Sequence, residues 1–395
     1  MKSRLVLSVI GVFCAAALFA QGGGTQFGLS AENPGISVVG DFIGHYNITE
    51  DKGFLGIGEV ELGFQAYVDP FARVDVFIGY HGIELAHHNH DDDDDDHEHG
   101  LEVEEAVLTL TSLPFGFQFS IGRMRSKIGF VNVLHLHDFH FAQYPMLIQE
   151  YWDHEGLITD GARLSWLAPL PIWVEFVVEG QSLLNQDAID FVAPGMNIFI
   201  PIGDEMGISL SGFGYFDSGL EKGNELVNHL RGHVDDDEKA DLENELAEIF
   251  ENPAFGFGGW GAGLRYKWAP LSVGFMNHFV IQGEVMSRAL GPDFYTGFYA
   301  LAQLKFLRRW TLGVMYNMWE VPHFHAHDDD DHHHHGDGAF EKEIESVFSA
   351  ALSFYASEFQ RIRLQYDMAM EHDETDHSLT LQWTFVLGPH APHAY

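Results

Sequence analysis

Many short segments of this chain alternate apolar and polar residues. Residues 361–370 carry apolar side chains at even positions and mostly polar ones at odd positions, and residues 378–387 repeat the pattern in the opposite phase. Residues 59–68 show it as well, with Glu59 and Glu61 in the polar phase. Because successive side chains of a β-strand point to opposite faces, this period of two predicts strands with one apolar and one polar face.

Sixteen such segments can be placed along the chain. Most are at least as long as the ~9–11 residues that a strand needs to cross an outer membrane. An even number of such strands predicts an all-β protein, a transmembrane antiparallel β-barrel of about 16 strands. The predicted strands cover approximately residues 35–46, 55–68, 71–83, 101–112, 115–128, 158–167, 171–181, 191–200, 206–216, 258–268, 271–284, 295–307, 310–321, 342–356, 361–372 and 377–388.

The connections between these segments are expected to alternate between short and long. Tight turns such as Asp69–Pro70 and Ala269–Pro270 stand between longer loops. Outer-membrane barrels have short periplasmic turns and longer extracellular loops, so the long loops are predicted to be extracellular. The predicted long loops are 84–100, 129–157, 217–257, 285–294 and 322–341.

A secreted β-sandwich or β-propeller would also show alternation. Two features favour the membrane barrel. The basic start Met1–Arg4 and the apolar run Leu5–Ala20 are typical of a secretory signal peptide cleaved after Ala20, and the last predicted strand carries the aromatic residues Trp383 and Phe385. The predicted organisation is a signal peptide at 1–20, an N-terminal segment at 21–34, the barrel at 35–388 and a tail at 389–395.

Composition narrows the class further. The net charge of −39 makes nucleic acid and anionic membrane surfaces poor partners. With 33 phenylalanines, 42 glycines and only 46% hydrophobic residues, the chain does not resemble a helical membrane protein. The one cysteine, Cys14, lies in the predicted signal peptide, so no disulfide or thiolate metal site is expected. No catalytic constellation stands out, and a non-enzyme is predicted.

Two segments, residues 87–99 and 323–335, combine histidine with acidic residues, and together they hold twelve of the 25 histidines. Imidazole and carboxylate are ligands for Zn²⁺ and for neighbouring metals such as Ni²⁺ and Cu²⁺. Both segments fall in long loops, on the predicted extracellular side. The candidate metal ligands are His87, His88, His90, Asp91, Asp93, Asp95, His97, Glu98, His99, His323, His325, His327, Asp328, Asp330, His332, His333, His334 and His335.

The other interpretation of these two segments is a solvated acidic low-complexity loop. Plain charge would not require twelve histidines, which favours metal binding. Binding by such loops is expected to be of modest affinity, because ordering them costs entropy. Since histidine titrates near pH ~6.5, metal capture should fail in acid.

Several motifs resemble a known family. Asn33–Ser37, Gly58–Leu62 and Val68–Ala72 look like its opening, and Gly122–Arg125 with Gly129, Asn132, Leu134, His135 and His137 looks like its central signature. The tail Leu387–His390 is similar to its ending. The family is the porin-like outer-membrane proteins related to phosphate-selective porins, of which some carry a label as zinc-regulated, TonB-dependent receptors. The resemblance covers the chain well up to His140 and beyond that mainly by pattern.

The resemblance implies an outer-membrane pore, and the receptor label can be weighed against the sequence. TonB-dependent transporters close a barrel of 22 strands with a plug. The segment 21–34 leaves no room for a plug, so TonB coupling is not expected and a passive pore is predicted. The expected surroundings are outer-membrane lipid and metal ions. A homotrimer is compatible with this class, although the sequence marks no subunit interface.

Charged residues predict parts of the pore lining. Arg123, Arg125 and Lys127 share one strand face, either as a cationic ladder inside, which needs a bulge near Gly122, or as rim residues that bind lipopolysaccharide phosphates. Charged rings select ions by sign, and the carboxylates outweigh these cations. The acidic residues that oppose anion selectivity are Glu59, Glu61, Glu104 and Glu105.

The loop 129–157 is predicted to fold into the barrel as the constriction. It carries His135, His137, Asp138 and His140, a cluster that either passes or holds a metal ion or is a set of hydrogen-bonded structural residues. The second interpretation is favoured, because the same residues carry the family resemblance.

Three functions follow from the sequence. The first is a pore whose outer loops bind and concentrate zinc or another divalent transition metal for passive uptake. The second is a general or anion-selective porin with incidental acidic loops. The third is a surface metal-binding protein without conductance.

Overall fold

A computed structural model describes most of the predicted barrel. The described residues are 30, 33–82, 85, 100–182, 191–217, 230–231, 234, 239–251, 258–271, 276–290, 293–324, 340–371 and 374–388. The predicted signal peptide, the C-terminal tail and both His/Asp segments, apart from His323 and Phe324, lie outside the described residues.

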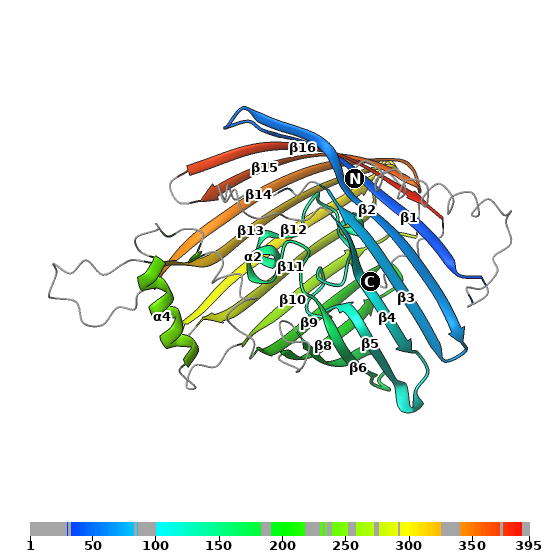
Figure 1. The fold of residues 1–395 in the computed structure, drawn as a ribbon. Helices are drawn as coiled ribbons and strands as arrows, with labels where there is room; N and C mark the ends of the chain where they lie inside the picture. Colours follow the sequence, from blue (N-terminus) through cyan, green and yellow to red (C-terminus); the bar gives the residue numbers. More distant parts are fainter. Residues whose placement is uncertain are drawn as a thin grey trace, which may run out of the picture.

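Sixteen antiparallel strands close into one barrel (Figure 1). Each strand pairs with its neighbours in sequence, and the first strand pairs with the last. This confirms the predicted fold class. The strands are β1 (Gly35–Asn47), β2 (Lys52–Asp69), β3 (Ala72–His81), β4 (Leu101–Leu110), β5 (Phe117–Arg125), β6 (Ile158–Leu167), β7 (Trp173–Ser182), β8 (Phe191–Ile202), β9 (Met206–Asp217), β10 (Gly258–Trp268), β11 (Met276–Leu290), β12 (Asp293–Phe306), β13 (Trp310–Phe324), β14 (Phe340–Ser357), β15 (Gln360–Glu371) and β16 (Glu374–Leu387).

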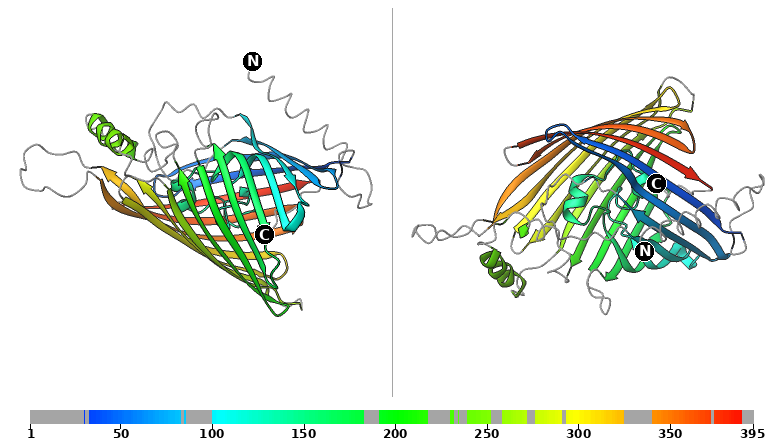
Figure 2. Two further views of the ribbon diagram at one scale, coloured as in Figure 1. Left: turned by 90° about the horizontal axis from the view of Figure 1, so that it is seen from below. Right: turned by 45° about the horizontal axis from the view of Figure 1, so that its top comes forward.

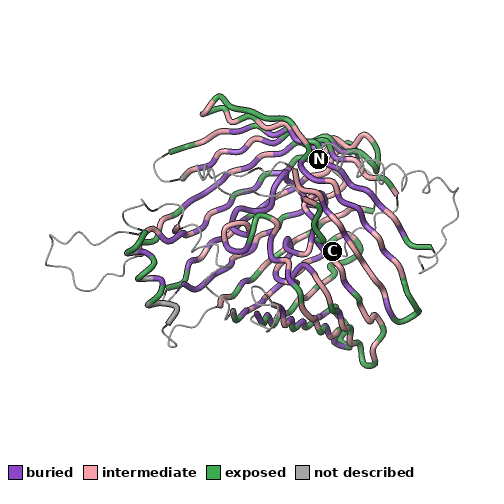
Figure 3. Tube along the Cα trace, viewed as in Figure 1, coloured by how far each residue is buried: buried purple, intermediate pink, exposed green. Residues whose placement is uncertain are grey.

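Two faces with different chemistry explain why the alternation predicted this barrel. Along β15, Ile362 and Leu364 are exposed on the outside, whereas Arg363 and Gln365 are buried on the inside. Figure 3 shows the same change between buried and exposed positions along most strands. The apolar outer face suits lipid, and every strand has two neighbours, so no sheet edge is left open. None of the helices in the described part of the chain is long and apolar enough to cross a membrane.

One predicted loop is wrong. Residues 285–294 were expected to form a long loop, but they extend β11 and β12, and only residues 291–292 join the two strands. The alternation of buried and exposed residues stops before the end of β11, because Met286, Ser287, Arg288, Ala289 and Leu290 are all buried. This part of the strand therefore has no period of two to detect in the sequence.

Consecutive antiparallel strands turn at alternate ends of the barrel (Figure 2), so the strand ends that lead into the longer connections, those of β3, β5, β7, β9 and β13, all lie at one end. The connections at residues 48–51, 291–292 and 372–373 belong to that end as well, so it does not consist only of long loops. The connection between β9 and β10 contains the helix α4 (Lys239–Glu251), whose Leu242 and Leu246 are buried.

The connection between β5 and β6, residues 126–157, turns into the barrel and is called the inner loop below. It contains the 3-10 helix η2 (Leu136–Asp138) and the short helix α2 (Met146–Tyr151), which lies inside the ring of strands in Figure 1. This confirms the prediction that loop 129–157 folds into the barrel.

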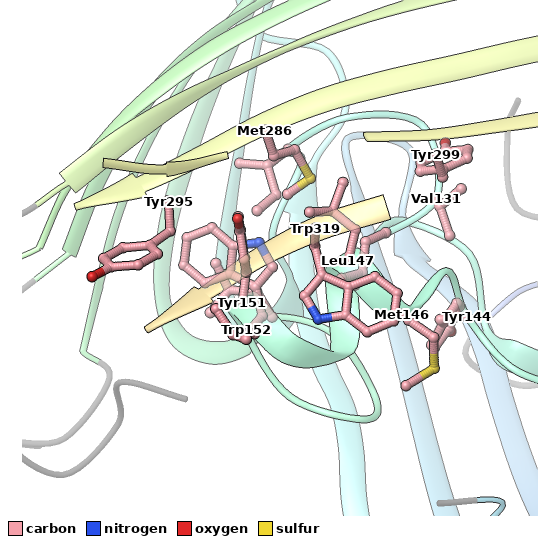
Figure 4. Packing of buried hydrophobic residues seen from close by; sticks show 14 of the residues in the cluster. Val131, Tyr144, Met146, Leu147, Tyr151, Trp152, Met286, Tyr295, Tyr299 and Trp319 are labelled. Carbon is pink, nitrogen blue, oxygen red and sulfur yellow. The ribbon is translucent and has the colours of Figure 1, made fainter. Parts of the chain in front are cut away.

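Apolar packing holds the inner loop against the barrel wall (Figure 4). Leu147, Tyr151 and Trp152 of the inner loop belong to one buried cluster with Tyr295 of β12 and Trp319 of β13. Burying a large apolar side chain contributes about 1.5–3 kcal/mol, so several of them fix the loop in place. The interior of this barrel is therefore a packed structure on the side of β8–β14.

Candidate functional site

Four glutamates on two strands form an acidic surface inside the barrel. Glu59 and Glu61 lie two residues apart on β2 and so share its inner face. In β4, the pairing with β3 shifts between Phe77 and Ile78, and the bulge brings the consecutive residues Glu104 and Glu105 to the same region. These four residues are called the acidic wall.

His135 of the inner loop is surrounded by the acidic wall. Its Nδ1 lies 2.5 Å from Glu61 Oε2 and 3.3 Å from Glu104 Oε2. Its Nε2 lies 3.3 Å from Glu105 Oε1. The side chains of His135 and Glu61 are completely buried, and the imidazole packs on Phe77 at 4.8 Å between ring centroids. His135 thus has a carboxylate at both ring nitrogens.

His137 follows His135 by two residues in the inner loop and faces the same wall. Its Nδ1 lies 3.7 Å from Glu59 Oε1 and 4.0 Å from Glu61 Oε2. The turn of η2 places the His135 and His137 rings side by side, with centroids 5.5 Å apart. Glu61, His135 and His137 offer ligand atoms within 4.8 Å of one another, as do Glu59, Glu61 and Glu104. Either set has the donor types of a metal site.

The carboxylates change the protonation of both histidines. Burial alone would lower the pKa of His135, but Glu61, Glu104 and Glu105 outweigh it and raise this pKa well above its usual value. For His137, burial is outweighed by Glu61 and Glu59, and the pKa rises to about 9. Without a metal, both imidazoles therefore carry a proton at neutral pH and offset part of the charge of the wall.

A second group of ion pairs fastens the end of the inner loop. His81 of β3 contacts Glu155 Oε1 with Nδ1 at 2.8 Å and Glu104 Oε1 with Nε2 at 3.3 Å. Arg125 Nη1 donates a hydrogen bond to the Glu155 carbonyl at 2.6 Å. Burial would raise the pKa of Glu155, but His81 and Arg125 outweigh it and lower this pKa. His81 was not predicted from the sequence, although it follows the inward-facing Phe77 by four residues and therefore lies on the same face of β3.

The next part of the inner loop meets basic residues. Arg363 Nη2 donates to the Phe139 carbonyl at 2.8 Å, and Arg361 Nη1 donates to the same oxygen at 3.4 Å. The Ala142 amide donates to Gln365 Oε1 at 2.8 Å. Burial, followed by Arg363, Arg361, Arg265 and His278, lowers the pKa of His140 to about 3. Arg265, Arg361 and Arg363 are called the basic wall. In the inner loop, Asp138 stands between His137, which faces the acidic wall, and His140, which lies near the basic wall.

Two of the three predicted basic residues are paired with carboxylates and do not form a ladder of free cations. Arg125 Nε lies 3.6 Å from Glu105 Oε1, and Lys127 Nζ lies 2.6 Å from Glu175 Oε1. Arg123 is half-buried and pairs in register with Asp160 of β6. Arg125 and Lys127 thus neutralise carboxylates inside the barrel.

The bulge expected near Gly122 is absent from the strand register, which runs unbroken through this residue to both neighbouring strands. Gly122 instead has a φ of 132°, and a Cβ there would lie 2.0 Å from the Ala106 carbonyl oxygen. Only glycine fits this backbone. The bulge of this region lies in β4, at Glu104.

Of the predicted surface metal ligands, the structure describes only His323. It lies near the end of β13, with Nδ1 3.7 Å from Glu343 Oε2 of β14. The remaining candidates in segments 87–99 and 325–335 lie outside the described residues, so their role as ligands stays a prediction.

Comparisons with known proteins support the barrel class. No protein-family model matches the chain. An uncharacterized protein of Aquifex aeolicus is 26% identical over 382 residues, which cover 89% of this chain and 72% of that protein.

Solved structures resemble the chain at the level of the fold. Pseudomonas putida OprB superimposes with a TM-score of 0.56 and 10% identity, over 90% of this chain and 94% of OprB. The anion-selective porin of Comamonas acidovorans gives 0.52 and 9%, over 90% and 99%. A loop-deletion mutant of the Vibrio cholerae outer-membrane protein OmpT gives 0.55 and 8%, also over 90% and 99%. This chain therefore has the sixteen-stranded barrel fold of the outer-membrane porins.

Proposed function

We propose that this protein is a passive outer-membrane channel that takes up divalent transition-metal ions, most of all Zn²⁺. The observation that carries this proposal is the acidic wall, with Glu59, Glu61 and Glu104 buried inside the barrel beside histidines of the inner loop. Charged groups lining a pore select ions by sign, so the wall favours cations. Imidazole beside carboxylate favours transition metals among them.

The topology supports a role for the His/Asp segments in this uptake. They belong to the connections β3–β4 and β13–β14, which leave the barrel at the same end as the inner loop. We assign this end to the cell surface, because outer-membrane barrels carry their longer loops there. Ions held by the segments would then be concentrated above the inner loop. The proposal includes a homotrimer, the form in which OmpT of Vibrio cholerae has been described.

Two observations favour other functions. The basic wall is typical of a pore that admits anions, which supports a general or anion-selective porin. The apolar cluster between the inner loop and β11–β13 narrows the lumen, which supports a surface metal binder without conductance.

Planar-bilayer conductance of the refolded chain from residue 21 onward separates these functions. The control, called the run variant, has asparagine in place of the twelve histidines of segments 87–99 and 323–335 and keeps their aspartates. Metal uptake predicts cation-preferring channels whose current responds to micromolar Zn²⁺ in the parent, and the run variant, which keeps the acidic wall, should need a higher Zn²⁺ concentration for the same response. Channels indifferent to Zn²⁺ would indicate a general porin, and an anion-preferring reversal potential would contradict cation uptake. A protein without channels would be a surface binder.

A further inference from the structure

We propose that the inner loop and the acidic wall form a binding site for one divalent transition-metal ion, with Glu61, His135 and His137 as ligands. This inference rests on the proposed function, which would bring metal ions to the site. It adds a specific, buried site inside the barrel to the loosely binding segments outside it.

The distances between donor atoms fit such an ion. Zinc bonds of ~2.0–2.2 Å in a tetrahedral site place ligand atoms ~3.3–3.6 Å apart. Around Glu61, the distances are 2.5 Å to His135 Nδ1 and 4.0 Å to His137 Nδ1. These values lie on either side of the tetrahedral spacing, so small side-chain rotations suffice to bring the donors to an ion. Glu59 and Glu104 are near enough to supply the fourth ligand, at 3.7 Å from His137 Nδ1 and 3.3 Å from His135 Nδ1 respectively.

The buried charge of the acidic wall gives the site its affinity for a cation. Glu59, Glu61 and Glu104 lie within 4.8 Å of one another and are all buried. Carboxylates held together away from water repel one another and require a counter-charge. Glu61 Oε1 is buried and accepts no hydrogen bond from the described residues. A divalent ion would supply two positive charges and a partner for this oxygen.

Glu105 is placed to orient the ligand His135 without binding the metal itself. Histidines that bind a metal through one ring nitrogen usually donate a hydrogen bond from the other nitrogen to a carboxylate. His135 Nδ1 faces Glu61, while Nε2 lies 3.3 Å from Glu105 Oε1. Arg125 in turn lies 3.6 Å from the same Glu105 oxygen and fixes it. The arrangement selects the ring orientation that aims Nδ1 at the metal.

The base of the inner loop is tied in a way that keeps both histidines at the wall. Asn132 Nδ2 donates to the Ser126 carbonyl at 2.7 Å, and Asn132 Oδ1 accepts from the Leu157 amide at 2.7 Å. These bonds join the two ends of the loop just before His135 leaves it for the wall. The ligands from the loop therefore meet those from β2 with little loss of conformational freedom.

The test uses the run variant, so that surface histidines do not compete for the metal ion. The protein begins at residue 21 and is refolded in detergent. Co²⁺ serves as the probe, because its visible absorption spectrum reports coordination by histidine in a site of low symmetry, and Zn²⁺ should displace it. The expected result is one Co²⁺ per chain. His135→Gln and His137→Gln should each abolish this absorption.

Two further variants sharpen the test. His154→Gln removes an exposed histidine of the same loop, whose Nδ1 contacts Asp153, and should leave binding unchanged. Glu105→Gln should weaken binding by ~10–100-fold without abolishing it, as expected for an outer partner. Circular dichroism and heat-modifiable electrophoretic mobility establish that each variant forms the barrel.

The outcomes separate the site from the channel. Absence of bound Co²⁺, or equal binding by the His135, His137 and His154 variants, would overturn the site and leave a network of ion pairs. These results are independent of conductance, so a site that persists in a channel indifferent to Zn²⁺ would support the site while the uptake function fails. Absence of Co²⁺ binding together with a zinc-responsive current would overturn the site and support the uptake function.

Discussion

The two ends of the segment from His135 to His140 contrast in a way that the sequence alone does not indicate. His135 lies among glutamates and has a pKa well above its usual value, whereas His140 lies near three arginines and has a pKa lowered to about 3. The residues are of one type, close in sequence and both inside the barrel. The wall against which each histidine lies therefore decides its charge. One loop thereby spans two regions of opposite potential.

The largest effect is expected from removing a glutamate at the acidic end. Glu61→Ala should lower the free energy of unfolding by about 3–5 kcal/mol, because it leaves the buried His135 without its closest counter-charge. Urea titration of the refolded barrel measures this change. Glu374→Ala, at an exposed position of β16, is the matched control and should change little. A loss below ~1 kcal/mol for Glu61→Ala would mean that the loop does not depend on the acidic wall.

At the basic end, a smaller loss of stability is expected. Arg363→Gln removes the 2.8 Å hydrogen bond to the Phe139 carbonyl, and a bond from a charged donor contributes about 1.5–3 kcal/mol. The loss should lie toward the lower value, because the substitution also relieves repulsion with Arg361. The same urea titration measures the free energy of unfolding of Arg363→Gln and of Glu61→Ala. If both variants lost the same amount, the acidic end would not contribute more to stability than the basic end.

Ion selectivity is expected to move in opposite directions at the two ends. Arg363→Gln should raise the preference for cations and Glu61→Gln should lower it, each on the order of two- to fivefold, since a screened charge is worth up to about 1 kcal/mol. Reversal potentials across a KCl gradient measure both. Shifts in the same direction would contradict a lumen with two walls of opposite effect.

Mildly acidic pH should weaken the attachment of the basic end first, because the glutamates that hold the acidic end stay ionised until lower pH. His140 has a pKa of about 3 in place against Arg363, Arg361, Arg265 and His278, and one near ~6.5 when detached. As pH falls from ~6.5 toward 3, the detached loop binds a proton that the attached loop does not, so attachment weakens by up to about tenfold per pH unit. Hydrogen exchange of the Ala142 amide, corrected for the intrinsic rate, measures the opening. His140→Gln should remove this dependence.

The smallest effect is expected outside both walls. His154 pairs with Asp153 at a half-exposed position of the same loop, and such pairs are worth at most ~1 kcal/mol. His154→Gln should therefore leave the urea midpoint almost unchanged. A loss comparable to that of Glu61→Ala would show that the position of a histidine relative to the walls is not what matters.

The fold was largely predictable from local pattern, because a strand between lipid and a polar interior must alternate. The segment 191–200 is weakly patterned, yet it matches β8 (Phe191–Ile202). The error at β11 arose where Met286, Ser287, Arg288, Ala289 and Leu290 are all buried. Such a strand has no polar phase to detect at that point.

The candidate site was predictable only in part. The parity of Glu59 and Glu61 and the length of the inner loop followed from the sequence. The meeting of His135 with β2 and β4 did not, because it depends on where a long loop packs. The bulge that brings Glu104 and Glu105 together has no local sequence signal. The parity of His81 with Phe77 was a signal for its inward orientation, but its partner Glu155 lies at the far end of the inner loop. The partners of His140 come from β10, β11 and β15, which are distant in sequence.

The seam between the first and the last strand has a consequence for how this protein is made. β1 pairs with β16 over ten residues, from Val38 opposite Leu387 to Asn47 opposite Ser378, with Phe42 packed on Trp383. Until β16 arrives, the edges of β1 and β15 expose backbone amides and carbonyls that no lipid can satisfy. Closure of the barrel must therefore wait until β16 has been synthesised. A chain ending before Glu374 would lack the partner of β1 and could not close this barrel.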